Sequence, residues 1–258
     1  YDEYHFEQVK KCIKFNKQIF VEKPLCLTNS QLRIIKGMVK KKKINIESNF
    51  VLRTTDLFNK LMRILKREIN KLYYIEADYL WSRYKKLFGW RNKTKNFSLI
   101  LGGAIHMIDL ICWLINKYPI EVKTYANNIA LKNTNFKKNS FFLIILKFKN
   151  NLLVKLSFNS NSNTNHFHQL KIFTANKSIF HTPQGTDCYF KNKKILSNLG
   201  RYPDKNNRKQ LINEYLKRLF KKKLKYENNE SLFKVMKICF AAIESEKKNK
   251  SIKINYEN

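Results

Sequence analysis

The stretch Val21-Glu22-Lys23-Pro24 has the residue types of a ligand site that exchanges protons. It follows a short apolar segment, residues 18–22, that we expect to be a β-strand, and it precedes a capped helix. Open α/β folds bind ligands at the carboxyl ends of such strands. A cis peptide bond before Pro24 would fix a sharp turn and direct Lys23 outward. With a lowered pKa, Lys23 could exchange a proton with a substrate hydroxyl. The alternative interpretation is a surface-loop lysine in a lysine-rich chain.

A second set of chemically active residue types lies in the segment Gly102–Leu114. Its two leading glycines permit close approach of the backbone just ahead of a predicted helix. His106, Asp109 and Trp113 follow at positions i, i+3 and i+7, so they share one helical face. A histidine in the first helical turn could act as an acid or base on a hydroxyl hydrogen. The alternative is a core histidine held by Asp109.

The elements around Lys23 follow an α-β-α-β order. We expect a helix over residues 4–15 and strands over 18–22 and 44–50. Thr28 and Gln31 form a capping box that opens the helix between the two strands. This order is the repeating unit of a parallel, doubly wound sheet. Residues 1–50 are too few for a whole sheet, so we expect further strands upstream of Tyr1 and interpret the chain as a fragment.

The remaining sequence is richer in strand-like segments. We expect helices at 56–70, 103–115, 208–221 and 230–247, and strands at 73–80, 122–131, 140–149, 152–159, 166–180 and 251–255. Asn150-Asn151 is a tight-turn sequence between two of these strands, and residues 181–208 read as loop-rich. Many strands with few helices predict a large mixed or antiparallel sheet with helices on one face.

The charge of the chain is strongly positive. Its 52 Lys and Arg against 19 Asp and Glu give a formal charge of +33, which raises the alternative of a basic nucleic-acid binder. The lysines are dispersed, however, and they accompany Asn, Ile, Phe and Tyr, which A/T-rich codons supply. Dispersed charge is typical of a solvated surface, so we expect no specific nucleic-acid partner. The field would still attract anionic ligands.

The cysteines and the apolar runs bear on the compartment. Five cysteines at irregular spacing are typical of reduced thiols, so we expect a cytoplasmic protein. No apolar run is long enough for a transmembrane helix. His166 and His168 have the spacing of metal ligands, but no Cys, Asp or Glu stands near them in sequence, and we expect no metal site.

Taken in order, these motifs resemble the glucose–fructose oxidoreductase, inositol dehydrogenase and rhizopine-catabolism (Gfo/Idh/MocA) family. The resemblance covers essentially the whole chain. It begins at residues 1–5 and continues through residues 21–25 and 48–53 to the block of two glycines followed by His-x-x-Asp-Leu-x-x-Trp-Leu. It implies that residues 1–50 are the C-terminal part of a Rossmann NAD(P)-binding domain. Residues 51–258 would form an α+β substrate and dimerisation domain, with the last helix packing back toward the nucleotide domain.

The resemblance also implies roles for individual residues. Lys23 would lie at the nicotinamide and substrate and act with His106 on the substrate hydroxyl, while Asp109 would be structural. Glu22, Pro24 and His5 would help to bind the cofactor, NAD or NADP. The remaining candidates, which would face the substrate, are Arg53, Tyr79, Arg83, Trp90, Arg91 and His168. Their arginines would suit an acidic or phosphorylated sugar.

The chain departs from the family pattern in two places. The family often has an aspartate four residues before the histidine, where this chain has Gly102. The Gly-rich phosphate loop, which the family carries upstream, is absent, so we expect the isolated chain to be inactive.

The resemblance implies an NAD(P)-dependent oxidoreductase that acts on a CH-OH group. Hydride would move between nicotinamide and a hydroxyl or carbonyl of a sugar, inositol or nucleotide-sugar. The alternative is a non-catalytic cofactor- or sugar-binding protein on the same fold. We also expect a homo-oligomer formed through the large sheet.

Overall fold

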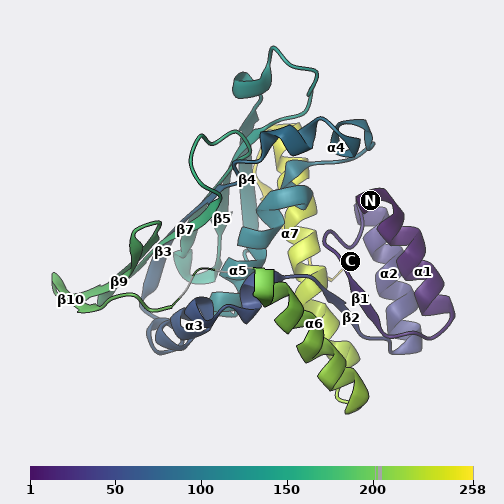
Figure 1. Cartoon of the computed structure of the whole chain (residues 1–258), viewed down its shortest axis with the longest axis horizontal. Coiled ribbons are helices and arrows are strands. Elements are labelled where there is room, and N and C mark those ends of the chain that lie inside the picture. Colours follow the sequence, from purple (N-terminus) through teal and green to yellow (C-terminus); the bar gives the residue numbers. More distant parts are fainter. Residues whose placement is uncertain (201, 203–204, 258) are drawn as a thin grey trace.

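The computed structural model describes residues 1–200, 202 and 205–257. A turn at Asp2–Tyr4 leads into a small N-terminal unit of two helices and two strands. Its elements are α1 (His5–Lys14), β1 (Ile19–Val21), α2 (Asn29–Lys42) and β2 (Ile46–Ser48). β1 and β2 pair in parallel, as the α-β-α-β order predicts. α1 and α2 lie side by side (Figure 1).

Capping fixes the start of α2 as the sequence predicts. The Thr28 side chain accepts a hydrogen bond from the Gln31 backbone N–H, and the Gln31 side chain accepts from the Thr28 N–H. Leu32, Ile35 and Val39 form the buried stripe of this helix. The segment between β1 and α2 is therefore held at both ends, and it carries Lys23.

The second part of the chain is built on a large sheet. Within the described residues, nine strands run in the order β10-β9-β8-β7-β3-β6-β5-β4-β11, and β3 pairs with β6 in parallel while the other neighbours are antiparallel. The strands are β3 (Leu72–Leu80), β4 (Glu121–Asn127), β5 (Phe141–Lys147), β6 (Leu153–Asn159), β7 (Phe167–Thr174), β8 (Lys177–Thr182), β9 (Gly185–Phe190), β10 (Lys193–Leu196) and β11 (Ile252–Lys253). The mixed sheet agrees with the predicted fold class.

Helices accompany the sheet in the second part of the chain. They are α3 (Asp56–Glu68), α4 (Trp90–Lys93), α5 (Ile105–Ile115), α6 (Lys205–Phe220) and α7 (Asn229–Lys248). α7 contacts β4, α5, α2 and β2, and it lies between the sheet and the N-terminal unit (Figure 1). Asn229 at its start accepts from the Ile46 N–H at 2.7 Å and donates to the Ile44 carbonyl at 2.8 Å. The last helix thus fixes the strand that follows the Lys23 segment.

Two predicted segments differ in the structure. Residues 166–180, expected as one strand, form β7 and part of β8, because the Thr174 hydroxyl accepts from the backbone N–H groups of Asn176 and Lys177 and closes a turn. Residues 181–208, expected as loop, contain the whole β9–β10 hairpin, whose turn uses left-handed Lys191 and Asn192. The Asn150-Asn151 turn is confirmed, since both residues have positive φ and connect antiparallel β5 and β6.

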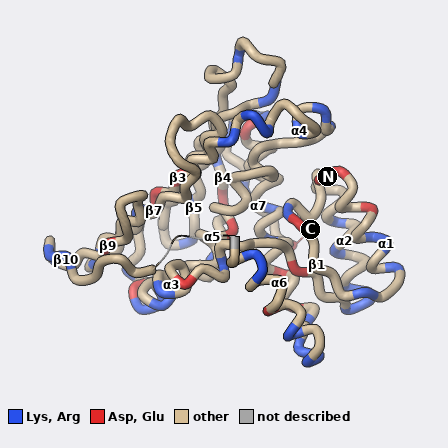
Figure 2. The backbone as a smooth tube through the Cα atoms, viewed as in Figure 1, with Lys and Arg blue, Asp and Glu red and all other residues tan. Residues whose placement is uncertain are grey.

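The positive charge is spread over the whole fold. Lys and Arg lie on helix ends, loops and the tips of hairpins in Figure 2, so the dispersal seen in the sequence persists in space. None of the helices in the described part of the chain is both long and apolar enough to cross a membrane.

Candidate functional site

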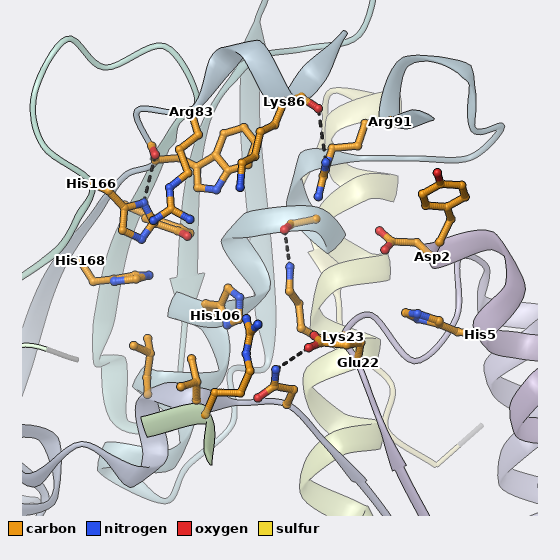
Figure 3. A pocket seen from close by; sticks show the side chains of 18 residues that line it. Asp2, His5, Glu22, Lys23, Arg83, Lys86, Arg91, His106, His166 and His168 are labelled. Atoms are coloured by element: carbon orange, nitrogen blue, oxygen red, sulfur yellow. Dashed lines mark hydrogen bonds between the residues drawn. The ribbon is translucent and has the colours of Figure 1, made fainter. Parts of the chain in front are cut away.

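A cavity of about 450 Å³ lies where the N-terminal unit faces the large sheet. One side is formed by His5, the first residue of α1, and by Glu22 and Lys23, which directly follow β1. His168 of β7 lies on the opposite side (Figure 3), and Tyr79 of β3 also lines the cavity. The carboxyl end of β1 therefore opens into this space, where parallel α/β units place ligand-binding residues.

Lys23 projects from a sharp turn into the cavity. The Lys23–Pro24 peptide bond is cis, as the sequence analysis proposed. The Lys23 ammonium donates to the Gly102 carbonyl oxygen at 2.5 Å (Figure 3). Burial lowers the pKa of this lysine, while the negative charges of Asp2 and Glu22 oppose the shift. A lysine with a lowered pKa can lose and regain its proton nearer to neutral pH than an exposed one.

Two further contacts hold the Lys23 turn in place. Glu22 accepts a hydrogen bond from the Asn49 side chain at 2.6 Å, which ties the end of β1 to the residue after β2. His5 Nδ1 lies 2.7 Å from the Pro24 carbonyl oxygen. His5 and Glu22 line the cavity, whereas Pro24 is buried behind it. These contacts brace the turn that carries Lys23.

Gly102 supplies the acceptor for Lys23 from its backbone. It lies in a single π-helical turn, Ile100–Ala104, that leads directly into α5. A Cβ atom at Gly102 would come within 2.9 Å of the Phe97 ring. An aspartate side chain here would therefore require Phe97 to move. The Gly102 carbonyl is therefore the hydrogen-bond partner of Lys23 at the position where the sequence comparison expected an aspartate.

His106 lies in the first turn of α5 and faces the cavity. Its ring packs edge-on against Tyr79 and His168, at 6.4 Å between centroids in each case. Its Nδ1 is shielded from solvent and has no hydrogen-bond partner among the described residues. Burial, followed by the charge of nearby Lys23, lowers the pKa of His106 well below 6.5. The ring is therefore neutral at pH 7.

Asp109 does not hold His106. Its carboxylate accepts two hydrogen bonds from Arg53, and the two form an ion pair in which Asp109 is buried. The alternative of a core histidine held by Asp109 is therefore wrong. The same pair removes Arg53 from the predicted substrate contacts, because its guanidinium is bound to Asp109 and lines a different hollow, beside Trp113. The pair joins the start of the second region to α5.

Strand register brings the aromatic and histidine residues together. Tyr79 of β3 is the cross-strand neighbour of His168 on β7, and their rings stack at 4.0 Å between centroids. His168 Nδ1 lies 2.5 Å from the Tyr202 hydroxyl, while its buried Nε2 has no partner among the described residues. His166 Nδ1 lies 3.0 Å from the Trp81 carbonyl oxygen. His168 and His166 therefore add polar edges to an aromatic wall.

The segment after β3 carries cations over the cavity. Arg83 and Arg91, both predicted to face the substrate, line it, and Lys86 between them does so as well (Figure 3). Trp90, predicted to contact substrate, stands behind the cavity. Its ring stacks on Tyr1 at 5.1 Å and carries the Arg91 guanidinium at 4.3 Å. Trp90 thus orients Arg91 and does not itself line the cavity.

Sequence reasoning missed several residues of the cavity. They are Asp2, Asn49, Trp81, Lys86 and Arg208. Burial raises the pKa of Asp2, although Lys23 and His5 oppose that shift. Lys86 could have been found from its position three residues after Arg83 and five before Arg91. Arg208 reaches the cavity from α6, more than a hundred residues after Lys23 and His106 in the sequence. No local sequence pattern indicates this position.

The arrangement suits proton transfer to and from a hydroxyl-bearing ligand. Lys23 has a lowered pKa and one firm acceptor, and neutral His106 lines the same cavity. Such groups act as general acid and base when a reacting oxygen lies within hydrogen-bond reach. In the described part of the chain, no group of three or more His, Cys, Asp or Glu side chains is arranged to hold a metal ion.

The chain is similar to known oxidoreductases. The family model described as "Oxidoreductase family, C-terminal alpha/beta domain" (Gfo/Idh/MocA) matches residues 62–253. Among solved structures, a myo-inositol 2-dehydrogenase from Lactobacillus plantarum has a TM-score of 0.81 at 16% identity, covering 99% of this chain and 78% of that one. A levoglucosan dehydrogenase in complex with NADH and levoglucosan has a TM-score of 0.82 at 16% identity and covers 98% and 78%.

A third structure extends the likeness in fold. An oxidoreductase from Agrobacterium radiobacter, in complex with NAD+, L-tartaric acid and magnesium, has a TM-score of 0.82 at 11% identity, with 98% of this chain and 78% of that chain covered. At these identities the solved structures establish the fold. A search of curated proteins gives no significant match.

Proposed function

The chain belongs to the Gfo/Idh/MocA family of oxidoreductases. From this premise we propose that it is part of an NAD(P)-dependent dehydrogenase. Hydride would move between nicotinamide and a carbon that bears a hydroxyl or carbonyl on a sugar, inositol or nucleotide-sugar. The observation that carries the proposal is the Lys23 ammonium, bound to the Gly102 carbonyl at 2.5 Å in a cavity that is also lined by His106, whose Nδ1 has no partner among the described residues. Dinucleotides and sugars bound to solved relatives support it.

The residues at the Lys23 turn fit the nicotinamide end of such a cofactor. Glu22, Lys23 and His5 border open cavity space, and Pro24 closes the turn behind them. The segment from Glu22 to Thr28 contains no glycine, so a phosphate-binding loop is not formed there. When bound, the dinucleotide would accept or supply the hydride. We infer that residues 1–50 are part of a Rossmann nucleotide-binding domain, with residues 51–258 as the substrate and dimerisation domain.

Lys23 would transfer the proton of the substrate hydroxyl, and His106 would hold the reacting oxygen. In the oxidation direction, neutral Lys23 would take the proton of the substrate hydroxyl as the carbon loses hydride, and in reduction the ammonium would return it to the carbonyl oxygen. His106 would hold the same oxygen by a hydrogen bond from a neutral ring, because its pKa is lowered well below 6.5. Each group would act within hydrogen-bond reach of one oxygen.

The test is turnover by the full-length protein that contains this chain. Absorbance of the reduced nicotinamide is followed with NAD and NADP against a panel of sugars, inositols and nucleotide-sugars. The proposed function predicts turnover with at least one of them. Binding of the dinucleotide without turnover of any panel member would instead favour the alternative, a non-catalytic binding protein. The observation that favours this alternative is Gly102, which stands where the family often has an aspartate.

The open face of the large sheet supports a homo-oligomer. Leu143 and Ile145 of β5 and Phe173 of β7 are half-buried on the strand positions that alternate with the core. Lys155 pairs there with Glu76 and Asp78. Apolar residues mixed with paired charges are typical of an interface between subunits, so we propose that two copies pack through this face.

Sedimentation of the full-length protein checks the oligomer. We predict a dimer that Ile145→Asp converts to monomer, because the charge would be buried against the partner. Ile34→Asp, at an exposed position of α2 in the N-terminal unit and away from this sheet face, is the matched control. A wild-type protein that sediments as a monomer at all concentrations would contradict the proposal.

The cysteines support a reducing compartment. All five are free, and Cys26, Cys112, Cys188 and Cys239 are buried. Buried thiols without disulfides are usual in proteins of the cytoplasm, which is the location we propose.

A further inference from the structure

Three cations on one short segment point into the cavity. Arg83 and Lys86 lie between the end of β3 and α4, Arg91 lies in the first turn of α4, and Figure 3 shows the three above Lys23 and His106. Unpaired lysines on open surface are ordinary in a chain with 52 basic and 19 acidic residues. Cations that converge in a concave site differ from cations on an open surface, because the low-dielectric walls of the site strengthen their electric field. We call residues 83–91 the basic segment.

The cavity does not neutralise these charges from within. Among the described residues that line it, Lys23, Arg83, Lys86, Arg91 and Arg208 are cations, and Asp2 and Glu22 are the acids. Glu22 accepts from Asn49, and no ion pair of the described chain involves a cation of this cavity. On the opposite face of the same sheet, by contrast, Lys155 is paired with acids. The cavity is therefore left with a net positive charge.

The basic segment holds Arg91 in place before any ligand binds. The Arg91 guanidinium lies over the Trp90 ring at 4.3 Å and donates from Nη1 to the Lys86 carbonyl oxygen at 3.3 Å. A guanidinium has five N–H donors in a fixed fork, so donors remain for a carboxylate or phosphate. Orientation in the free protein reduces the entropy that binding would otherwise cost.

The wall of the cavity beneath the basic segment carries neutral hydrogen-bonding groups, the histidine rings. His168 is only 5% exposed, and its Nε2 has no partner among the described residues although the side chain lines the cavity. His106 Nδ1 has none either. Buried polar atoms of this kind are costly unless a ligand or water satisfies them. Hydroxyl groups can both donate and accept, so they match neutral histidines of either tautomer.

We propose that the substrate of this site is an anionic polyol, a sugar acid or a sugar phosphate. Its anionic group binds under the basic segment, between Arg83, Lys86 and Arg91. Its hydroxyl groups lie along His168 and His106, which brings one of them to Lys23. This inference rests on the proposed function, since it names the substrate class of the same cavity.

Equilibrium binding to the full-length protein tests the inference without any turnover. Titration calorimetry compares gluconate with glucitol, its neutral counterpart, and glucose 6-phosphate with inorganic phosphate. We expect at least one anionic polyol to bind at least ~10-fold more tightly than glucitol and than phosphate, because charge-assisted hydrogen bonds are stronger than neutral ones. The preference between gluconate and glucose 6-phosphate identifies the anion as carboxylate or phosphate.

Substitutions in the basic segment test where the anionic group of the ligand binds. Arg83→Gln and Arg91→Gln should each weaken binding of the preferred anionic polyol by about 10-fold and leave glucitol binding unchanged. Lys85→Gln removes the same charge from an exposed residue of the same segment that does not line the cavity, and it should have no effect.

Three results would overturn the inference. They are equal or absent binding of all four ligands, phosphate bound as tightly as the preferred anionic polyol, and equal effects of Arg83→Gln and Lys85→Gln. Selective anion binding by a protein that turns over no substrate would refute the proposed function alone. A dehydrogenase that prefers neutral polyols would refute this inference alone.

Discussion

The hydrogen bond between Lys23 and the Gly102 carbonyl is the central contact at the scale of single residues. A carbonyl carries only a partial charge, so it holds the ammonium without the full stabilisation that a carboxylate would give. Burial then dominates and lowers the pKa of Lys23. Loss of the expected aspartate therefore does not leave Lys23 unpositioned, and it favours the neutral amine that oxidation of a hydroxyl requires.

Sequence reasoning found Lys23 and His106 because each sits in a local pattern, after a strand and at the start of a helix. It failed for Arg53, whose partner Asp109 lies 56 residues away in sequence. Arginine types are equally suited to bind a substrate acid or a buried carboxylate, and only the tertiary contact distinguishes the two.

The Arg53–Asp109 pair gives a prediction at this scale. Asp109→Asn should lower the free energy of unfolding by about 3–5 kcal/mol, because a partly buried guanidinium would lose its charged partner. Urea unfolding measures the change. Asp56→Asn breaks an exposed pair with Lys60 and should cost less than about 1 kcal/mol. Equal effects of the two substitutions would show that the buried pair has no special role.

At the scale of elements, the approach of α5 to the sheet positions His106. The π-helical turn before α5 contacts β6, and a Cβ atom at Gly103 would lie 2.1 Å from the ring of Phe158. Phe158 is fully buried, so it has little room to move. Glycine at this position is therefore what allows the helix to begin so close to the strand that neighbours Tyr79.

Gly103→Ala tests this packing. The added methyl should destabilise the protein by about 1–3 kcal/mol through overpacking. Gly37→Ala is the matched control, since no atom lies within 4 Å of a Cβ there and the site is mid-helix in α2, where alanine should stabilise by about 0.5–1 kcal/mol. Thermal or urea unfolding measures both. A neutral Gly103→Ala would contradict the proposed contact with Phe158.

Elements with clear periodicity were predictable, and those set by turns were less so. The capping box, α1 to α3 and the β5–β6 hairpin follow from apolar spacing and from Asn150-Asn151. The β9–β10 hairpin was missed because its strands are short and polar and its turn is Lys191-Asn192, which has no glycine. The side-by-side placement of Tyr79 and His168 depends on strand order, which the sequence pattern does not encode locally.

At the scale of the whole molecule, neutral histidines make stability depend on pH. Burial lowers the pKa of His181 to about 4, and it also lowers the pKa of His166 and His168. The unfolded state, with a histidine pKa of about 6.5, then binds more protons than the folded state between pH 6.5 and the folded pKa. Stability is therefore complete above pH 6.5 and is lost as the pH falls below it.

His181 should account for ~3 kcal/mol of this loss by pH 4. We predict that His181→Gln reduces the fall in unfolding free energy between pH 7 and pH 4.5, although it also removes the hydrogen bond to Thr186 at every pH. Urea unfolding at both pH values measures the difference. Wild type and variant with the same pH dependence would show that His181 is not buried in its neutral form.

The cavity joins the N-terminal unit, which holds Lys23, to the sheet and α5, which hold Tyr79, His168 and His106. The most direct test of the proposed function is kcat/KM for oxidation by the full-length protein as a function of pH, with the best substrate of the panel. Wild type should gain activity as the pH rises through a pKa below 10.5, because neutral Lys23 is the base. Lys23→Met should lose about 10²–10⁴-fold at all pH values, in line with loss of a general base, while Lys17→Met, on an exposed lysine outside the cavity, should keep the wild-type profile. A Lys23→Met enzyme with full turnover would contradict the assignment of this cavity as the site of dehydrogenation.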